Sequence, residues 1–399
     1  MNILILTNKM PYPPNDGGAI ATMSMAVAFA DAGNQVTILA MNTSKHFFDV
    51  ARIPVELSKK IEFHGVYLNT DLSAGKALKN LLISSIPYNA QRFISEEFDK
   101  KIADLLKEKE YDIIQLEGIY VGPYIRTIRK HSKALVSMRA HNVEHEIWER
   151  TAGLAKGFKK IYLRNLAKRI KRFEISMINN YDVLVPITER DAKRFLDFGC
   201  RIPVHVAPTG INTANLKPGF ENFDFPNLFH LGALDWAPNQ EGLKWFFSKV
   251  WPLVRKEHPS LKFYLAGRNA PPYFSSMNIP NVVFLGEVEN AHAFIRSKAI
   301  MIVPLLSGSG LRIKIIEGMA LGKAIVTTGI GIEGINGEHK QNVMIADDAE
   351  SFARAIHYLL EDNNRVINMG KQASEFIFRH YDNRKIIKSL ITFYNQNLS

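Results

Sequence analysis

The 399-residue sequence contains a single cysteine, Cys200, and no stretch of about 18 uncharged apolar residues. One cysteine excludes an internal disulfide and a zinc site built from cysteines. Without a long apolar stretch, no segment is expected to span a membrane. The first residues, MNILILTNKM, also lack the basic segment and the apolar length of a signal peptide. We therefore expect a cytoplasmic protein, either soluble or peripheral at the inner face of the cytoplasmic membrane.

Acidic residues are fewer than basic ones, with 39 Asp and Glu against 50 Lys and Arg and a net charge of +11. This excess fits an anionic partner such as nucleic acid, a membrane surface or a phosphorylated ligand. The basic residues lack the interleaved aromatic side chains of a recognisable nucleic-acid-binding module, so we expect no nucleic acid. The sequence also has no Asp-x-Asp pair, and we expect neither a metal nor another cofactor.

Short apolar runs alternate with helical patterns along the chain, which is typical of parallel strands joined by crossover helices. The runs NILILT (2–7) and QVTILAM (35–41) flank a Pro/Gly loop and a helical pattern that ends at Gly33. This is the order of a mononucleotide-binding half of a doubly wound sheet. The pattern restarts at LFHLGAL (228–234), so the chain is expected to form two Rossmann-like α/β domains.

The segment SGSGLRIKIIEGMALGKAIVTT (307–328) joins a glycine-rich loop to the start of a helix. Helix N-termini bind phosphate through free N–H groups and a positive dipole end, and Arg312 and Lys314 add positive charge. Glu317 is unsuited to phosphate but suits a pair of ribose hydroxyls. Phosphates and a ribose together indicate a nucleotide. Taken alone, the same residues also fit a surface turn before a core helix.

Five further motifs accompany this segment in a fixed order. They are PPNDGGA (13–19), RAHNVE (139–144), APTGINTANLKP (207–218), LFHLGALDWAPNQEGLKWF (228–246) and FYLAGR (263–268). The ordered set resembles the retaining, nucleotide-sugar-dependent glycosyltransferases of family four, the glycosyl transferases group 1. The resemblance implies the GT-B fold, in which two Rossmann-like doubly wound domains face a central cleft. We expect an acceptor-binding domain at 1–207, a nucleotide-sugar-binding domain at 208–379, and a helix at 380–399 that crosses back to the first domain.

The resemblance also implies roles for individual residues. His141 takes the position of the family's active-site histidine, and Arg268 that of a phosphate-binding arginine. The residues expected to bind the donor are Gly17, Gly18, Arg268, Ser309, Gly310, Leu311, Arg312, Lys314 and Glu317. Those expected to contact the acceptor are Asp16, Glu144, Thr188 and Glu189. The family usually carries a first glutamate where Ser309 stands, and this departure leaves the identity of the donor sugar open.

The implied activity is that of a hexosyltransferase-like, metal-independent enzyme. It would move a sugar from a UDP- or GDP-sugar to a glycan or lipid-linked acceptor in cell-envelope polysaccharide synthesis. Two other GT-B activities, sugar-nucleotide epimerisation and phosphorolysis, would use the same nucleotide site. An oxidoreductase would need G-x-G-x-x-G after the first strand, where TNKMPYPPNDGG stands instead. Non-catalytic binding of an anionic ligand is a further alternative.

Residues 156–178 carry an excess of positive charge, with eight Lys and Arg before the first acid, Glu174. Apolar residues at helical spacing lie in the same segment: Phe158, Ile161, Tyr162, Leu163, Leu166, Ile170 and Phe173. A basic amphipathic helix is typical of an element that binds an anionic membrane surface. A packed helix with a solvated basic face is the alternative. A membrane contact here would suit a lipid-linked acceptor.

Overall fold

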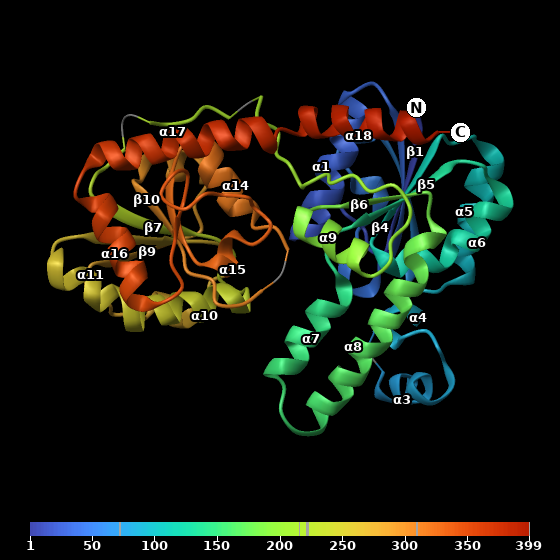
Figure 1. Ribbon diagram of the computed structural model, residues 1–399, viewed down its shortest axis with the longest axis horizontal. Coiled ribbons are helices and arrows are strands. Elements are labelled where there is room, and N and C mark those ends of the chain that lie inside the picture. The colour runs from blue at the N-terminus through green and yellow to red at the C-terminus, as the bar shows by residue number, and fades with distance from the viewer. Residues whose placement is uncertain (72, 215, 221–222, 309, 399) are drawn as a thin grey trace. The chain divides into compact units, whose positions relative to one another are not determined.

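The computed structural model describes residues 1–71, 73–214, 216–220, 223–308 and 310–398. The chain folds as two compact units: unit 1, Met1–Gly210 with Asn383–Ser399, and unit 2, Ile211–Asp382 (Figure 1). Within the described residues, each unit is built on a six-stranded sheet whose strands pair in parallel. The doubly wound α/β class predicted from the sequence is therefore confirmed.

The sheet of unit 1 has the order β3-β2-β1-β4-β5-β6. Its strands are β1 (Asn2–Thr7), β2 (Gln35–Thr43), β3 (Ile61–Leu68), β4 (Ile113–Glu117), β5 (Leu135–Ala140) and β6 (Val183–Pro186). The register sets Glu117, the last residue of β4, between Thr7 of β1 and Arg139 of β5. Since parallel strands end at a common edge, the side chains that follow these strands gather there.

Helices cover both faces of this sheet because its strands are apolar on both sides. The helices of unit 1 are α1 (Gly17–Asp31), α2 (Val55–Ser58), α3 (Ala74–Ile83), α4 (Tyr88–Gln91), α5 (Glu96–Glu108), α6 (Ile125–His131), α7 (Glu144–Leu154), α8 (Gly157–Met177), α9 (Glu189–Asp197) and α18 (Asn383–Asn397). Short 3-10 turns lie at Ser44–His46, Val50–Arg52, Ile119–Tyr124 and Ile178–Asn180. Along β1, Leu4 and Leu6 face α5 and α6, whereas Ile3 and Ile5 face α1 and α18.

The last helix, α18, belongs to unit 1 although it follows all of unit 2 in the sequence (Figure 1). It packs against α1, and its apolar stripe of Ile386, Ile387, Leu390 and Tyr394 is buried with the residues of β1 and α1. The Tyr394 ring stacks on Phe29 of α1 at 6.4 Å between centroids. The first and last segments of the chain thus share one hydrophobic layer.

Unit 2 repeats this architecture with the strand order β12-β11-β10-β7-β8-β9. Its strands are β7 (Asn227–Leu231), β8 (Lys262–Ala266), β9 (Val282–Gly286), β10 (Ile300–Val303), β11 (Ala324–Thr327) and β12 (Met344–Ile345). Its helices are α10 (Ala237–Trp245), the π-turn Phe246–Val250, α11 (Trp251–Glu257), α12 (Pro272–Ser275), α13 (Ala291–Ser297), α14 (Ile313–Ala320), α15 (Gly329–Ile332), α16 (Ala349–Leu360) and α17 (Asn363–His380). One face of the sheet packs on α11 and α16, and the other on α14 and α17.

The packing of α18 predicts that unit 1 becomes less stable when a buried side chain of this helix is shortened. Leu390 is fully buried, so Leu390→Ala should lower the free energy of unfolding of unit 1 by about 2–5 kcal/mol. Hydrogen exchange of β1 and β4, measured by mass spectrometry, reports on unit 1 separately from unit 2. Thr392→Ala, an exposed change on the same helix, is the control. Equal protection of β1 in both variants would show that α18 does not support the sheet.

Candidate active site

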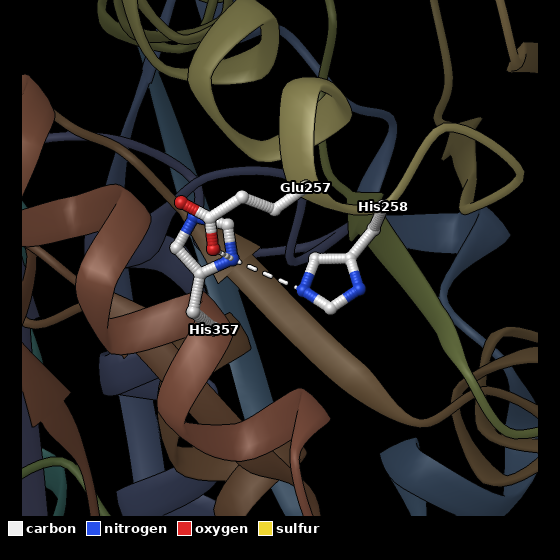
Figure 2. A group of neighbouring side chains, drawn as sticks. All are labelled: Glu257, His258 and His357. Carbon is white, nitrogen blue, oxygen red and sulfur yellow. Dashed lines mark hydrogen bonds and ion pairs between the residues drawn. The ribbon is translucent and has the colours of Figure 1, made fainter.

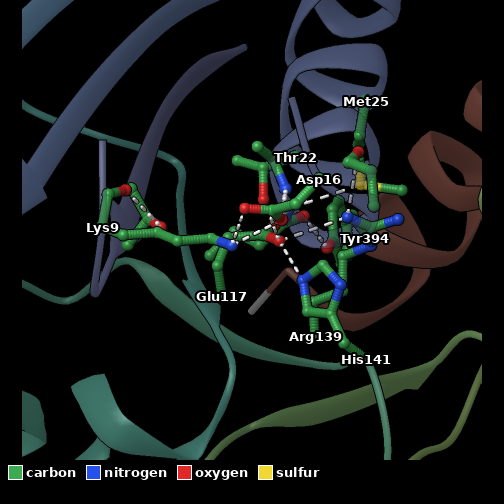
Figure 3. Close-up of polar contacts among 12 residues, drawn as sticks. Lys9, Asp16, Thr22, Met25, Glu117, Arg139, His141 and Tyr394 are labelled. Atoms are coloured by element: carbon green, nitrogen blue, oxygen red, sulfur yellow. Dashed lines mark hydrogen bonds and ion pairs between the residues drawn. The ribbon is translucent and has the colours of Figure 1, made fainter. Parts of the chain in front are cut away.

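An ion pair between Lys9 and Asp16 joins the loop after β1 to the start of α1. Asp16 caps α1 by accepting a hydrogen bond from the Ala19 N–H at 3.0 Å, and Lys9 Nζ lies 2.6 Å from Asp16 Oδ1 (Figure 3). Burial acts to raise the pKa of Asp16, but Lys9 outweighs it and the pKa is lowered. Gly17 and Gly18 form the first turn, and a Cβ on Gly18 would lie 3.3 Å from Lys9 Nζ. Asp16 is therefore a charged cap at the edge where the strands end.

Glu117 is a buried carboxylate at the end of β4, and four side chains donate hydrogen bonds to it (Figure 3). Its Oε2 accepts from Thr22 Oγ1 at 3.0 Å, from Arg139 Nη1 at 3.2 Å and from His141 Nε2 at 2.5 Å. Gln115 Nε2 donates to its Oε1. Burial acts to raise the pKa of Glu117, but Arg139 and His141 outweigh it and lower the pKa to about 2. Glu117 is therefore ionised at neutral pH.

The charge of Glu117 fixes the orientation of His141. An ionised carboxylate can only accept hydrogen bonds, so Nε2 of His141 carries the proton that the two groups share. Nδ1 is then the nitrogen left to interact with a ligand, as an acceptor when the imidazole is neutral. The His141 side chain is 18% exposed, whereas those of Glu117 and Arg139 are exposed by 2% and 1%. Only the histidine of this group reaches the surface of unit 1.

A second layer of hydrogen bonds connects this group to α18. Tyr394 donates from its hydroxyl to Gln115 Oε1 at 2.9 Å, and Ser137 Oγ lies 2.9 Å from the same hydroxyl. Gln115 and Ser137 are fully buried strand residues. The C-terminal helix is thus linked to His141 through two neighbouring side chains, Gln115 and Glu117. Sequence reasoning missed Glu117 and Tyr394, although a glutamate that ends an apolar strand just before Gly118 is a usable signal.

The residues expected to contact an acceptor lie at the starts of three helices of unit 1: Asp16 at α1, as described above, Glu144 at α7, and Thr188 and Glu189 at α9. Glu144 opens α7, and its Oε1 accepts from Tyr120 Oη at 2.7 Å and from Trp148 Nε1 at 3.3 Å. Burial raises the pKa of Glu144. Thr188 caps α9 by accepting from the Asp191 N–H, and Glu189 is exposed in the first turn of that helix.

A cavity of about 40 Å³ brings His141 and Glu144 together. Its lining also includes Gly118, Asn142 and Tyr181, and it does not include Thr188 or Glu189. The strand-end edge of unit 1 therefore combines an oriented histidine with a carboxyl group that burial holds closer to its protonated form.

In unit 2, the ends of β7 and β8 approach so closely that only glycine fits. A Cβ on Gly267 would lie 1.9 Å from the Gly232 carbonyl oxygen. A Cβ on Gly232 would lie 3.1 Å from Lys314 Nζ and 3.3 Å from His230 Nε2. His230 donates from Nδ1 to the Ile302 carbonyl at 2.8 Å, so its Nε2 is an acceptor beside Lys314. Because Gly232 has no side chain, its backbone lies directly against Lys314 and His230.

Lys314, on the first turn of α14, is half-buried. Its Nζ donates to Asn239 Oδ1 of α10 at 2.6 Å. Burial, with the nearby charge of Arg312 as a second cause, lowers the pKa of Lys314 to about 7. Binding of an anion beside Nζ would favour the protonated form. The sequence did not identify His230 or Asn239 as site residues. His230 lies inside an apolar strand pattern, and Asn239 lies near the start of a helical pattern.

Glu317 lies one turn further along α14. Burial raises the pKa of its carboxyl group, and the carboxylate accepts no hydrogen bond from any residue that the structure describes. A carboxylate in this setting can accept two hydrogen bonds from vicinal hydroxyls. Glu317, which was predicted from the sequence, therefore has a carboxylate that can accept hydrogen bonds from a ligand.

The other residues of unit 2 that were predicted to bind the donor lie in the loop before α14 and in the turn after β8. Gly308 and Gly310 have φ of +115° and +80°, which favours glycine at both positions. Arg312 is buried, donates from Nη1 to the Gly310 carbonyl, and lies with its guanidinium 5.8 Å from the Trp236 ring centroid. Arg268 is exposed in the turn after β8, and Leu311 is partly exposed. Ser309 lies outside the described residues.

Among the described residues, one group of three side chains could hold a divalent cation (Figure 2). His258 Nε2 lies 3.1 Å from His357 Nδ1, which lies 3.3 Å from Glu257 Oε2. His258 precedes β8, so the group lies at the amino ends of the strands. The residues described above follow the carboxyl ends. No helix in the described part of the chain is long and apolar enough to cross a membrane.

Comparison with known proteins matches two family models. The model described as Glycosyltransferase Family 4 matches residues 15–215, and that described as Glycosyl transferases group 1 matches residues 225–362. A relative from Klebsiella pneumoniae, described as an uncharacterized 44.6 kDa protein in the cps region, is 25% identical over 407 residues. The alignment covers 97% of this chain and 98% of the relative.

Solved structures of similar fold include a sucrose-phosphate synthase (tll1590) from Thermosynechococcus elongatus, with a TM-score of 0.71 and 15% identity. The alignment covers 99% of each chain. Alr3699/HepE from Anabaena, solved in complex with UDP-glucose, has a TM-score of 0.64 and 14% identity. That alignment covers 99% of this chain and 100% of the other.

The low pKa of Glu117 predicts how the stability of unit 1 depends on pH. Because the folded-state pKa is about 2, the stabilisation is complete above pH 4.5 and is lost as the pH falls towards 2. At pH 7, Glu117→Gln should destabilise unit 1 by about 3–5 kcal/mol, since it leaves the Arg139 charge buried without its partner. The difference from wild type should shrink by about 3 kcal/mol between pH 5 and 2.

Urea unfolding followed by hydrogen exchange of β4 and β5 measures this difference. Glu62→Gln, a change at an exposed glutamate of β3 in the same sheet, is the control and should cost less than about 1 kcal/mol. If Glu117→Gln does not fold, Glu117→Gln with Arg139→Gln removes both charges and should recover much of the loss. Wild-type stability of Glu117→Gln at pH 7 would contradict the assignment.

Proposed function

The chain belongs to glycosyltransferase family 4 and has the GT-B fold, and from this premise we propose that it is a retaining enzyme with a nucleoside-diphosphate-sugar donor. The donor is a UDP- or GDP-sugar, and the acceptor is a glycan or a lipid-linked glycan of the cell envelope. The UDP-glucose bound by the Anabaena protein supports a uridine donor. The cps-region description of the Klebsiella relative supports a role in polysaccharide synthesis.

One observation carries the donor assignment: a carboxylate and a half-buried lysine lie one turn apart on α14, with the lysine beside the backbone of Gly232. Glu317 would accept hydrogen bonds from the ribose hydroxyls, and Lys314 would contact the diphosphate. Arg268 and the N–H groups of the loop at Gly310 and Leu311 would add further positive potential. A diphosphate leaving group gains charge as the glycosidic bond breaks, and such fixed cations stabilise it. The proposed chemistry uses these protein cations and no metal.

In unit 1, His141 would sit against the donor sugar. Glu117 holds Nε2 of the imidazole, so Nδ1 is the atom proposed to accept a hydrogen bond from a sugar hydroxyl. The loop at Gly17 and Gly18 would border the same sugar. In the proposed reaction, as the family resemblance implies, the acceptor hydroxyl attacks the anomeric carbon on the face that the diphosphate leaves, and the configuration is retained. His141 is therefore proposed as a catalytic residue that contacts the donor.

Acceptor recognition is assigned to the remaining strand-end residues of unit 1. Asp16, Glu144, Thr188 and Glu189 are proposed to contact the acceptor. The segment 1–207 would be the acceptor-binding domain, 208–379 the donor-binding domain, and 380–399 the helix that completes the first. A lipid-linked acceptor would hold the enzyme at the inner face of the cytoplasmic membrane, which is the proposed location.

The donor assignment predicts that one nucleoside diphosphate raises the melting temperature of the protein, by mass action on the folded state. A panel of UDP, GDP, ADP and NAD in a thermal-shift assay identifies it. Glu317→Ala removes hydrogen bonds from a charged acceptor and should weaken binding by about 10- to 100-fold. Glu350→Ala, an exposed change in the same unit, should leave the shift unchanged. A response to NAD alone, or an equal response of Glu317→Ala, would overturn the proposal.

The pKa of Lys314 predicts that nucleotide affinity depends on pH. Below pH 7 the free protein already carries the charged lysine, whereas above pH 7 binding must also take up a proton. The ratio of wild-type affinity to that of Lys314→Gln should therefore fall by up to about tenfold per pH unit above 7. Calorimetry in buffers of different ionisation enthalpy measures affinity and proton uptake together. A ratio that stays constant from pH 6.5 to 9 would show that Lys314 does not contact the diphosphate.

A further inference from the structure

Helices α7 and α8 form an antiparallel hairpin that projects from the sheet of unit 1 (Figure 1). The hairpin has a small core of its own, in which Ala152, Leu163, Leu166 and Ile170 are buried. The apolar face expected for 156–178 is therefore divided. Its inner part packs on α7, and Tyr162 packs at the edge of this core, whereas Phe158 and Ile161 are exposed.

The tip of this hairpin exposes three large apolar side chains. Leu154 is 79% exposed, Phe158 92% and Ile161 66%. They fall within eight consecutive positions, at the end of α7 and within the first five residues of α8. Exposed apolar side chains clustered in this way mark a contact surface. The buried core of the hairpin does not include Leu154, Phe158 or Ile161. These three side chains can therefore contact another apolar surface.

Positive charge surrounds the exposed tip. Between Glu149 and Glu174 the sequence has no acidic residue, and its basic residues are Arg150, Lys156, Lys159, Lys160, Arg164, Lys168, Arg169, Lys171 and Arg172. Lys156, Lys159, Arg164 and Lys168 are exposed. Apolar side chains at a tip with lysine and arginine around them match the interface of an anionic bilayer, which offers hydrocarbon beneath phosphate. An acidic protein surface would pair the cations but would leave Phe158 and Ile161 without an apolar environment.

The hairpin is fastened to the site around His141. Glu174 of α8 accepts from the Glu144 N–H at 2.9 Å and contacts His145 Nδ1, so it closes the base of the hairpin. Glu146 of α7 accepts from Arg194 Nε of α9 at 2.8 Å. Further along α8, Arg169 donates to Asn80 Oδ1 at 2.9 Å and ties the end of α3 to the hairpin. These contacts fix the direction in which the tip points from unit 1.

The length of α7 sets the distance between His141 and the tip of the hairpin. Helix α7 begins three residues after His141 and has 11 residues, so its far end lies about 16 Å along the helix from its start. A tip seated among lipid headgroups would therefore hold His141 within one helix length of the bilayer surface.

We propose that the α7–α8 hairpin inserts its tip, Leu154, Phe158 and Ile161, into an anionic phospholipid surface. Insertion sets the distance between that surface and His141, where the glycan of a lipid-linked acceptor would be presented. The membrane contact itself needs only the hairpin, whereas its purpose rests on the proposed function. The hairpin then acts both as the anchor and as the spacer of the enzyme.

Sedimentation with vesicles of phosphatidylcholine, with or without phosphatidylglycerol, tests the contact. Wild type should sediment with the anionic vesicles and lose binding as salt is raised. Leu154→Ser with Phe158→Ser should weaken binding by roughly tenfold or more, and Lys159→Glu with Arg164→Glu should do the same. The matched controls are Phe47→Ser with Leu196→Ser, which are 60% and 54% exposed, and Lys249→Glu with Lys256→Glu. Both controls should bind like wild type.

The thermal shift by nucleotide separates this inference from the proposed function. Both hairpin variants should keep the wild-type shift, because none of the four substituted residues belongs to the proposed donor site. Wild type that stays in the supernatant with anionic vesicles overturns the inference, as does equal sedimentation of tip and control variants. Either result with an intact nucleotide shift leaves the proposed function standing. Sedimentation that depends on the tip, without any nucleotide shift, would support the anchor and contradict the donor assignment.

Discussion

The buried pair of Glu117 and Arg139 is the constraint on which the candidate site of unit 1 depends. Two charges are stable in such a position only when each has a partner, and Glu117 gathers Arg139, Thr22, Gln115 and His141 around one carboxylate. The register of β4 and β5 delivers Glu117 beside Arg139. His141 lies two residues beyond and is the exposed member of the group. The imidazole of His141 is therefore oriented by the hydrogen bond that it donates to the buried carboxylate of Glu117.

In unit 2, the absence of side chains on two glycines lets a charged side chain lie against the main chain. Gly232 and Gly267 let the ends of β7 and β8 approach so closely that a Cβ on Gly267 would collide with the neighbouring strand. Lys314 lies beside the end of β7, and Glu317 follows it one turn along α14. Burial moves the pKa of each towards its neutral form. A ligand that offers both phosphates and hydroxyls stabilises both charges at once, whereas a ligand that offers only one does not.

The sequence was informative where chemistry is local. The alternation of apolar runs and helices predicted the α/β class, which the structure confirms. The structure also places Arg312, Lys314 and Glu317 at a loop–helix junction, and the binding site predicted there stays a prediction. Glu117 was missed because three of its partners, Thr22, Arg139 and His141, come from other elements of the fold, and Tyr394 because it lies 279 residues from Gln115. For α8, helical spacing identified the apolar residues but not the face that α7 covers. Only packing separates buried Leu166 from exposed Phe158.

The most direct test of the account is the fate of the donor sugar. The protein would be incubated with UDP- and GDP-sugars and a lipid-linked glycan fraction, and the products would be analysed by mass spectrometry and by the proton coupling of the anomeric carbon. The account predicts that wild type transfers the sugar to the glycan with the anomeric configuration of the donor, and that His141→Ala loses most of this activity. An inverted linkage, an epimerised donor, a sugar 1-phosphate or an unreacted donor would contradict it.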